Sequence, residues 1–135
     1  MVSDDELLRL AWDVRERAVC TFSGFAVGVA LLDDNDRTFT GANVENASYN
    51  LGLCAERVAL YHGLTHHMGA VRRIALVTEA PALTYPCGAC RQALWEFAPD
   101  AEIILANRDE QRRVTMRDLL PHGFDASAFT PKPKS

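Results

Sequence analysis

The chain has 135 residues, of which 48% are hydrophobic and 24% are charged, and its formal net charge at pH 7 is -4. This balance is typical of a globular protein rather than a disordered one, and the length is sufficient for one hydrophobic core without disulfides. A negative net charge disfavours a nucleic acid polymer as a partner, because such polyanions usually bind to a basic surface.

The predicted elements follow from capping residues and from the spacing of apolar residues. Ser3 and Glu6 form a capping box before apolar residues at helical spacing, and Gly69 is placed to end a second helix. Helices are expected over residues 4–19, 54–68, 88–97 and 116–120, and strands over residues 25–32, 38–44, 72–78, 102–106 and 112–115. This alternation predicts an α/β domain in which helices cover a mixed sheet.

Residues 1–130 are expected to form a single domain, and residues 131–135, P-K-P-K-S, are expected to form a disordered tail. The first residues, M-V-S-D-D-E, are acidic and do not resemble a signal peptide, and no apolar run is long enough to cross a bilayer. We therefore expect a cytoplasmic protein with no membrane partner. Because cytoplasmic thiols stay reduced, the four cysteines are interpreted first as metal ligands or redox groups.

Three of the cysteines lie at or near the start of a predicted helix. Cys87 and Cys90 form the C-x-x-C pair of P-C-G-A-C, which alone is compatible with half of a zinc site, a redox pair or two buried apolar residues. Cys54 favours the zinc site, because a helix N-terminus stabilises a thiolate and three protein ligands leave the fourth tetrahedral position open. Cys20 could supply a fourth ligand, but it has no local motif and is expected to be a buried small residue.

Glu56 follows Cys54 by two positions, so its carboxylate could lie beside the metal without binding it. A carboxylate next to a metal-activated water can transfer protons during catalysis. In isolation, Glu56 would instead be interpreted as a solvated glutamate in the first turn of a helix. The combination of C-A-E with a later P-C-x-x-C, however, resembles the signature of the zinc nucleobase deaminases.

Further motifs extend this resemblance to nearly the whole chain, from about residue 4 to residue 129. N-V-E-N-A-S-Y, C-A-E-R, P-C-G-A-C-R-Q and L-L-P-x-x-F follow one another in this order and together resemble the small cytidine deaminases of nucleoside salvage. The resemblance implies a three-layer fold in which helices flank a mixed five-stranded sheet. It also implies a homotetramer in which Cys54, Cys87 and Cys90 hold Zn²⁺.

The activity implied by the resemblance is the hydrolytic deamination of cytidine and 2'-deoxycytidine to uridine and 2'-deoxyuridine in pyrimidine salvage. Glu56 matches the glutamate that takes a proton from a water on the zinc and then delivers protons to N3 and to the departing ammonia. Arg57 resembles an arginine that hydrogen-bonds the ligand thiolates and so tunes the metal. Without the family, Arg57 would be interpreted as part of an exposed salt bridge. Arg91 and Gln92 are assigned only surface or packing roles.

The resemblance also implies which residues contact the nucleoside. Asn43 and Glu45 match residues that hydrogen-bond the sugar hydroxyls, and their spacing on a strand places both on one side. A glutamate there would repel phosphate, which favours a free nucleoside over a nucleotide. Phe25 matches an aromatic residue that packs against the substrate, and the backbone N–H of Ala55 matches a donor to the base carbonyl. Phe124 matches a residue that reaches the site of a neighbouring subunit.

The chain departs from the family pattern before Phe25. The family usually has A-Y-x-P-Y-S-x-F, whereas residues 18–25 are A-V-C-T-F-S-G-F, so that Val19 and Phe22 replace tyrosines and Thr21 replaces proline. This change leaves the zinc chemistry intact and affects the substrate preference and the tightness of the tetramer. It keeps open a second activity, the deamination of a modified cytosine nucleoside such as the antibiotic blasticidin S.

Deamination of a polymer and a purely structural zinc site are both less favoured. Deaminases that act on bases within tRNA or DNA usually have His in place of Cys54, and this chain has no basic channel. A zinc-stapled binding module without catalysis would need a fourth ligand to close the metal site, and Glu56 would then be dispensable.

Overall fold

A computed structural model describes residues 1–129, so the tail expected over residues 131–135 lies outside the described residues. The helices are α1 (Asp4–Arg15), α2 (Ala55–Thr65), α3 (Gly88–Phe97) and α4 (Met116–Leu119). The strands are β1 (Val27–Asp33), β2 (Thr38–Ala42), β3 (Val71–Thr78), β4 (Glu102–Ala106) and β5 (Gln111–Thr115). Short 3-10 helices cover Tyr49–Leu51 and Ala126–Ala128. The order of helices and strands is the predicted one.

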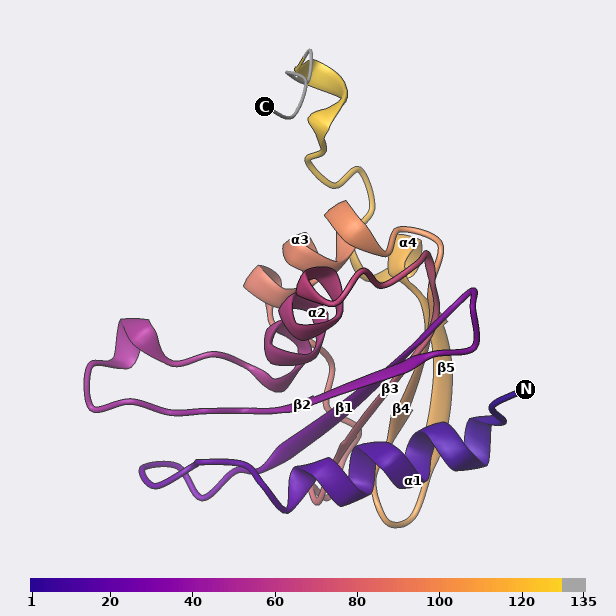
Figure 1. Cartoon of the computed structure of the whole chain (residues 1–135). Coiled ribbons are helices and arrows are strands. Elements are labelled where there is room, and N and C mark those ends of the chain that lie inside the picture. Colours follow the sequence, from indigo (N-terminus) through magenta and orange to yellow (C-terminus); the bar gives the residue numbers. More distant parts are fainter. Residues whose placement is uncertain (130–135) are drawn as a thin grey trace.

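The five strands form one mixed sheet in the order β2-β1-β3-β4-β5. Strands β3 and β4 are parallel, whereas the other neighbouring strands are antiparallel. Helix α1 covers one face of the sheet and helices α2, α3 and α4 cover the other (Figure 1). The predicted class, a three-layer α/β fold with a mixed five-stranded sheet, is therefore confirmed. Within residues 1–129, no helix has the length and the apolar character that crossing a membrane requires.

The central strands are buried on both faces because their successive side chains point into two different cores. On β3, Ile74 and Leu76 pack on the side of α2 and α3, whereas Ala75 and Val77 pack on the side of α1. Close packing of α1 also depends on Gly28 in β1, where a Cβ atom would lie 2.0 Å from the carbonyl oxygen of Ala11. The sheet is therefore packed on both faces and forms the middle layer, against which α2 and α3 lie.

Helix α1 ends at Arg15 and is shorter than the predicted helix over residues 4–19. The backbone N–H groups of residues 16–18 donate to the carbonyls three positions earlier, which is the tighter pattern of a 3-10 turn. Val19 then forms a parallel bridge with Val44. Pairing with a distant segment therefore replaces the last turn that the local pattern predicts.

Helix α2 also ends earlier than predicted, at Thr65. The left-handed residue that follows it is His67, with a φ of 59°, and not Gly69. The N–H of Met68 donates to the carbonyl of Gly63 over 2.9 Å, which is the hydrogen bond of a Schellman motif. The prediction that Gly69 ends the helix was wrong because a histidine adopts the conformation that usually favours glycine.

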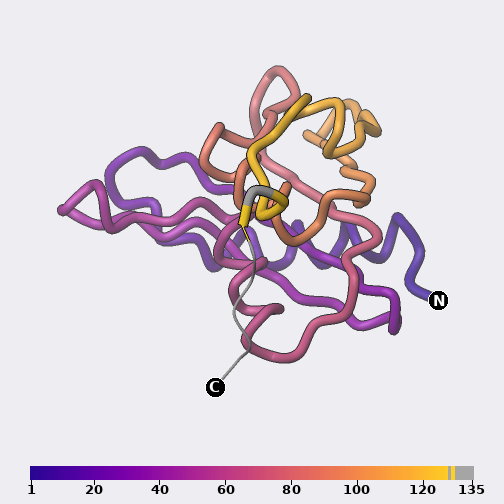
Figure 2. The backbone as a smooth tube through the Cα atoms, turned by 90° about the horizontal axis from the view of Figure 1, so that it is seen from above, coloured from indigo at the N-terminus to yellow at the C-terminus, as the bar shows by residue number. Residues whose placement is uncertain are grey.

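Residues 19–25 and 43–53 together form an arm that projects to one side of the sheet (Figures 1 and 2). Two isolated bridges, between Val19 and Val44 and between Val44 and Leu53, hold its segments together. The exposed large apolar residues of the arm are Val19, Phe22, Phe25, Val44, Tyr49 and Leu51. The departures from the family pattern therefore all lie on this arm.

Asp33, the last residue of β1, joins two loops of the chain. Its side chain is buried, with 1% exposure, and its carboxylate accepts the backbone N–H groups of Asn35, Arg37 and Gly69 over 3.0, 2.8 and 2.9 Å. One carboxylate therefore fixes both the turn between β1 and β2 and the loop before β3.

Asp4 connects the start of α1 with two strands. Its carboxylate pairs with Arg73 on β3 and, over 2.6 Å, with Arg113 on β5. These ion pairs lower the pKa of Asp4, the hydrogen bond from Arg113 having the largest effect. The first turn of α1 is thereby clamped to the sheet.

Candidate active site

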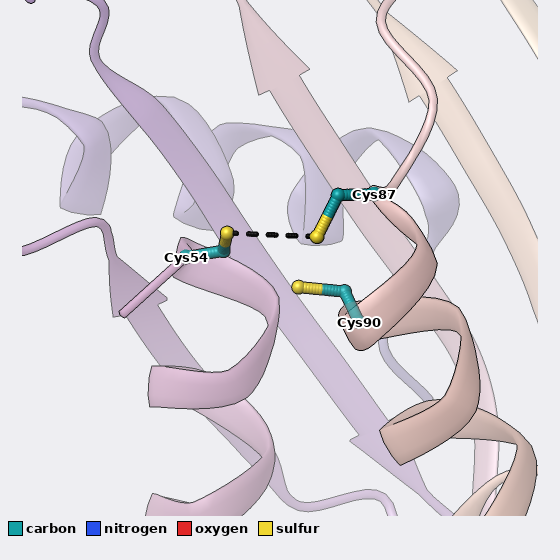
Figure 3. Close-up of side chains that lie close together, drawn as sticks. All are labelled: Cys54, Cys87 and Cys90. Atoms are coloured by element: carbon teal, nitrogen blue, oxygen red, sulfur yellow. Dashed lines mark hydrogen bonds between the residues drawn. The ribbon is translucent and has the colours of Figure 1, made fainter. Parts of the chain in front are cut away.

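The three cysteines predicted as ligands meet where α2 and α3 begin. Cys54 is the N-cap residue of α2, Cys87 is the N-cap residue of α3, and Cys90 lies in the first turn of α3. Their Sγ atoms all lie within 4.8 Å of one another, and those of Cys54 and Cys87 are 3.8 Å apart. Figure 3 shows the three sulfurs pointing toward a common centre from the two helices.

The spacing of the sulfurs fits a zinc ion. A tetrahedral Zn²⁺ with Zn–S bonds of about 2.3 Å requires its thiolate sulfurs to be about 3.8 Å apart. The separation of 3.8 Å between Cys54 and Cys87 has this value without any rearrangement. Among residues 1–129, the group of converging ligands comprises the three cysteines and does not include Cys20, which is half-buried on the arm. Three protein ligands are the number found in catalytic zinc sites.

The surroundings of Cys54 favour the thiolate form that a metal needs. A hydrogen bond from Cys90, together with the nearby Arg57, lowers the pKa of Cys54 to about 5 although burial opposes this shift. The same hydrogen bond to Cys54, together with burial, raises the pKa of Cys90. Both helix N-termini also carry partial positive charge. Cys54 is therefore the thiol whose ionisation these surroundings favour.

Arg57 lies in the first turn of α2 and faces the sulfurs. Its Nη2 atom is 3.8 Å from the Sγ atom of Cys54, and the thiols raise the pKa of its guanidinium. Among residues 1–129, its Nε atom is buried and has no hydrogen-bond partner. A half-buried cation next to sulfur atoms is suited to a cluster with net negative charge, as three thiolates around one Zn²⁺ would be.

Glu56 lies in the first turn of α2, between Cys54 and Arg57 in the sequence, and is buried, with 5% exposure. Burial raises the pKa of its carboxyl group, and the charge of Cys54 adds to this effect. A raised pKa makes the carboxylate a stronger base, which suits a group that takes up and returns a proton. The competing interpretation, a solvated glutamate at a helix start, was wrong.

Asn43 and Glu45 are brought to the same end of α2. The antiparallel bridge between Val44 and Leu53 brings Asn43 close to Cys54, and Glu45 lines a cavity of about 380 Å³ on the arm. Phe22, Ser23, Glu45, Asn46, Tyr49 and Gly52 line this cavity. The structure therefore places Asn43 opposite Cys54 and Glu45 in the wall of this cavity, whose lining residues do not include the metal ligands.

Both side chains also hold the segment that leads into β1. Asn43 accepts the N–H of Val27 with Oδ1 over 2.8 Å and donates from Nδ2 to the carbonyl of Phe25 over 2.8 Å. Glu45 accepts hydrogen bonds from residues 22 and 23. These contacts fix the backbone of Phe25, whose side chain is 42% exposed.

The fold and the site have counterparts in known proteins. Residues 1–106 match a family model described as the cytidine and deoxycytidylate deaminase zinc-binding region. The chain belongs to this family. A cytidine deaminase of Halalkalibacterium halodurans is 40% identical over 122 residues, which cover 89% of this chain and 92% of that protein. The resemblance stated from the motifs is thus confirmed.

Other deaminases of the family are similarly close. A cytidine deaminase of Mycobacterium tuberculosis is 41% identical over 109 residues, which cover 79% of this chain and 78% of that protein. The crystal structure of the cytidine deaminase from Burkholderia pseudomallei matches with a TM-score of 0.88 at 39% identity, covering 91% of this chain and 100% of that chain. The family model and the cysteine cluster together support Zn²⁺ as the cofactor of this deaminase.

Two residues of the deaminase motif C-R-Q do more than the sequence indicated. Arg91 donates from Nε to the carbonyl of Pro86 over 2.8 Å and from Nη1 to the carbonyl of Leu119 over 2.9 Å. Gln92 donates to the carbonyl of Phe124 over 2.7 Å. They therefore tie the ligand loop and the C-terminal segment to α3. Their position directly after the third ligand cysteine was the available signal, but it did not reveal their backbone partners.

The remaining predicted residues differ in their exposure. Ala55 is fully buried and, as the first residue of α2, has a backbone N–H without an acceptor inside the helix. Phe124 is 63% exposed, and its ring lies 5.9 Å from that of Phe129. It is not among the residues that line the cavity beside Glu45. Within residues 1–129, the ring of Phe124 therefore contributes nothing to this cavity.

Proposed function

We propose that the protein is a zinc-dependent hydrolase that deaminates cytidine and 2'-deoxycytidine to uridine and 2'-deoxyuridine. The observation that supports this proposal best is the burial of Glu56 directly beside three converging cysteine ligands, in a chain whose relatives are named cytidine deaminases. The reaction breaks the C4–N bond of the cytosine ring and forms a C4–O bond, so that water is consumed and ammonia is released. The amino-bearing ring carbon makes this a hydrolysis of a cyclic amidine.

Cys54, Cys87 and Cys90 would hold the zinc ion. When bound, zinc supplies a water ligand whose pKa is lowered toward neutrality. Glu56 would accept the two protons of this water one after the other at its carboxylate, and would donate one to N3 and one to the departing amino group. The raised pKa of Glu56, caused mainly by burial, suits a group that must carry a proton between these positions. Arg57 would balance the negative charge of the thiolates.

Asn43, Glu45, Phe25 and Ala55 are proposed to bind the nucleoside. The backbone N–H of Ala55 would donate to the base carbonyl, and Phe25 would pack against the substrate. Asn43 retains one N–H and one lone pair beyond its contacts with the arm, so it can still bind a sugar hydroxyl. Glu45 adds a carboxylate acceptor, which would repel a phosphate group and favours a free nucleoside.

The proposal includes a homotetramer, pyrimidine salvage and a cytoplasmic location. Exposed apolar side chains support assembly, because Tyr49, Leu51 and Phe124 are 81%, 64% and 63% exposed, respectively. In the tetramer, Phe124 would reach the site of a neighbouring subunit. The four free cysteines, Cys20 among them, suit a reducing compartment. A nucleic acid polymer and a membrane are not expected as partners.

Deamination of a modified nucleoside and a non-catalytic zinc module have less support. The relatives described above are named cytidine deaminases, and none of these names refers to a modified cytosine nucleoside. A binding module without catalysis would need a fourth ligand, whereas the ligand group within residues 1–129 consists of three cysteines. It would also have no need of a buried carboxyl group beside the metal.

The experiment that tests the proposal measures ammonia release from cytidine and deoxycytidine by the zinc-loaded protein. We expect turnover by the wild type and a loss of roughly 10²–10⁴-fold or more in Glu56→Ala, because a general acid–base group contributes about this much. Glu96→Ala, an exposed glutamate on α3, serves as the matched control and should retain activity. Zinc content is measured in each variant. Absence of turnover by the folded, zinc-loaded wild type on both nucleosides would refute the proposal.

A further inference from the structure

Ser23, which lies on the arm, connects two residues that are proposed to bind the substrate. Its hydroxyl donates to Oε2 of Glu45 and accepts the backbone N–H of Phe25 over 3.0 Å. The next residue, Gly24, has a φ of 67°, which allows the chain to turn back so that both contacts form on the same hydroxyl. Ser23 is therefore a direct link between the carboxylate of Glu45 and the backbone of Phe25.

The hydrogen bonds of Glu45 leave little of its carboxylate free. Oε1 accepts the backbone N–H groups of Phe22 and Ser23, each over 3.0 Å, and Oε2 accepts the hydroxyl of Ser23. A carboxylate has about four acceptor positions, two on each oxygen. Oε1 is thus saturated, and one position remains on Oε2. The hydroxyl of Ser23 occupies one of the two acceptor positions of Oε2, and so determines the direction in which the free acceptor position of this oxygen points.

The neighbouring groups make this arrangement suitable for binding a hydroxyl. Ser23 and Glu45 both line the cavity of about 380 Å³. Asn43 is fixed by hydrogen bonds to the backbone of Val27 and Phe25 and retains a free N–H, which can donate to a sugar hydroxyl. Hydrogen bonds from the Ser23 hydroxyl and backbone lower the pKa of Glu45, so that it remains an ionised acceptor at neutral pH.

We infer that Ser23 is a positioning residue for the sugar half of the substrate: its hydroxyl orients Glu45 so that the one remaining acceptor position receives a sugar hydroxyl. The inference rests on the proposed nucleoside deaminase activity. Ser23 does not touch the reacting base and acts through Glu45. Its removal should therefore weaken substrate binding and leave the chemical step unchanged. The effect should also depend on the presence of a hydroxyl on the sugar.

The test compares Ser23→Ala with the wild type on cytidine and on 2',3'-dideoxycytidine, which lacks both ring hydroxyls. Losing a hydrogen bond to a charged group weakens binding substantially. We therefore expect the KM for cytidine to rise about 10-fold in Ser23→Ala, with kcat within about 2-fold of the wild type. For the dideoxynucleoside, kcat/KM should differ by less than about 2-fold between the two proteins, because the contact that Ser23 supports is then unused.

Two controls accompany this comparison. Ser48→Ala makes the same change at an exposed residue of the arm, whose hydroxyl donates to Asn50 over 2.8 Å, and should match the wild type. Ser23→Thr keeps the hydroxyl and should retain most of the affinity for cytidine. If Ser23→Ala does not fold, Ser23→Cys, which keeps the side-chain volume but donates only weakly, takes its place.

The outcomes separate the inference from the proposal on which it rests. An equal loss on cytidine and on the dideoxynucleoside would mean that Ser23 only stabilises the arm, and it would overturn the inference while leaving the deaminase proposal intact. No loss on cytidine would overturn it as well. Absence of turnover by the wild type would instead refute the deaminase activity itself, and the inference with it.

Discussion

Replacing Arg57 tests how the protein holds a metal with three thiolates. Three thiolates and one Zn²⁺ have one net negative charge, and the carboxylate of Glu56 adds to it when ionised. Arg57 is the cation that faces this cluster, with its Nη2 atom 3.8 Å from the Sγ atom of Cys54. The variant Arg57→Gln removes the charge and keeps a polar side chain. We expect it to bind zinc more weakly.

The distance sets the size of the effect. Two unit charges about 4 Å apart interact with about 4 kcal/mol at an effective dielectric constant of about 20, which is an upper limit here. Cys54 and Arg57 are only half-buried, so solvent screens part of this energy. Partners that hydrogen-bond metal ligands usually contribute about 10–100-fold in metal affinity, which is about 1.4–2.7 kcal/mol. The expected loss in Arg57→Gln lies in this range.

The assay is a competition for zinc between the protein and a coloured chelator at neutral pH. Arg57→Lys keeps the charge and loses the planar guanidinium, so its affinity should lie between those of the wild type and Arg57→Gln. Arg72→Gln, an exposed arginine on β3, is the matched control and should bind zinc as the wild type does. Equal zinc affinities of Arg57→Gln and the wild type would show that the guanidinium does not stabilise the thiolates.

Two further predictions concern stability and assembly. Asp33→Asn should lower the melting temperature at pH 7 by about 4–8 °C, because it weakens hydrogen bonds worth about 1–2 kcal/mol. Burial raises the pKa of Asp33, but the hydrogen bonds from three backbone N–H groups lower it below the usual 3.8. The stabilisation is therefore present above about pH 4 and is lost as the pH falls through the folded-state pKa. The melting temperatures of the two proteins should thus become equal in acid. A difference in melting temperature that stays constant down to low pH would contradict this reasoning. In sedimentation equilibrium, the proposed homotetramer should have the mass of four 14.9 kDa chains. The Tyr49→Glu variant should have a lower mass because its subunits dissociate. A single-chain mass for the wild type would refute the homotetramer.

The fold was predictable where one physical signal dominates locally. The capping residue Ser3 does accept the N–H of Glu6, and the alternating apolar residues of β3 do enter two cores. The end of α1 was not predictable, because the pairing of Val19 with Val44 is a contact between distant segments. Such contacts compete with helix propensity and leave no local pattern in the sequence.

The metal centre was the most predictable part of the site. Cysteines at two helix starts constrain each other strongly, since one ion can join them only if the helices converge. The role proposed for Ser23 left no such signal, because a serine beside a glycine is common in loops. Its importance depends on the side chain of Glu45, which lies 22 positions away. The contacts of Arg91 were missed because its partners are backbone carbonyls, which every residue has and which no residue type marks in the sequence.

The clamp between Asp4 and Arg113 has a consequence for synthesis of the chain. These residues are 109 positions apart in the sequence, so their contact cannot form until β5 has left the ribosome. Until then β4 is an uncovered sheet edge, which offers its backbone groups to other nascent chains. The last strand thus both completes the sheet and fixes the first helix, and a chain that stalls before residue 111 keeps a sheet edge that is prone to aggregate.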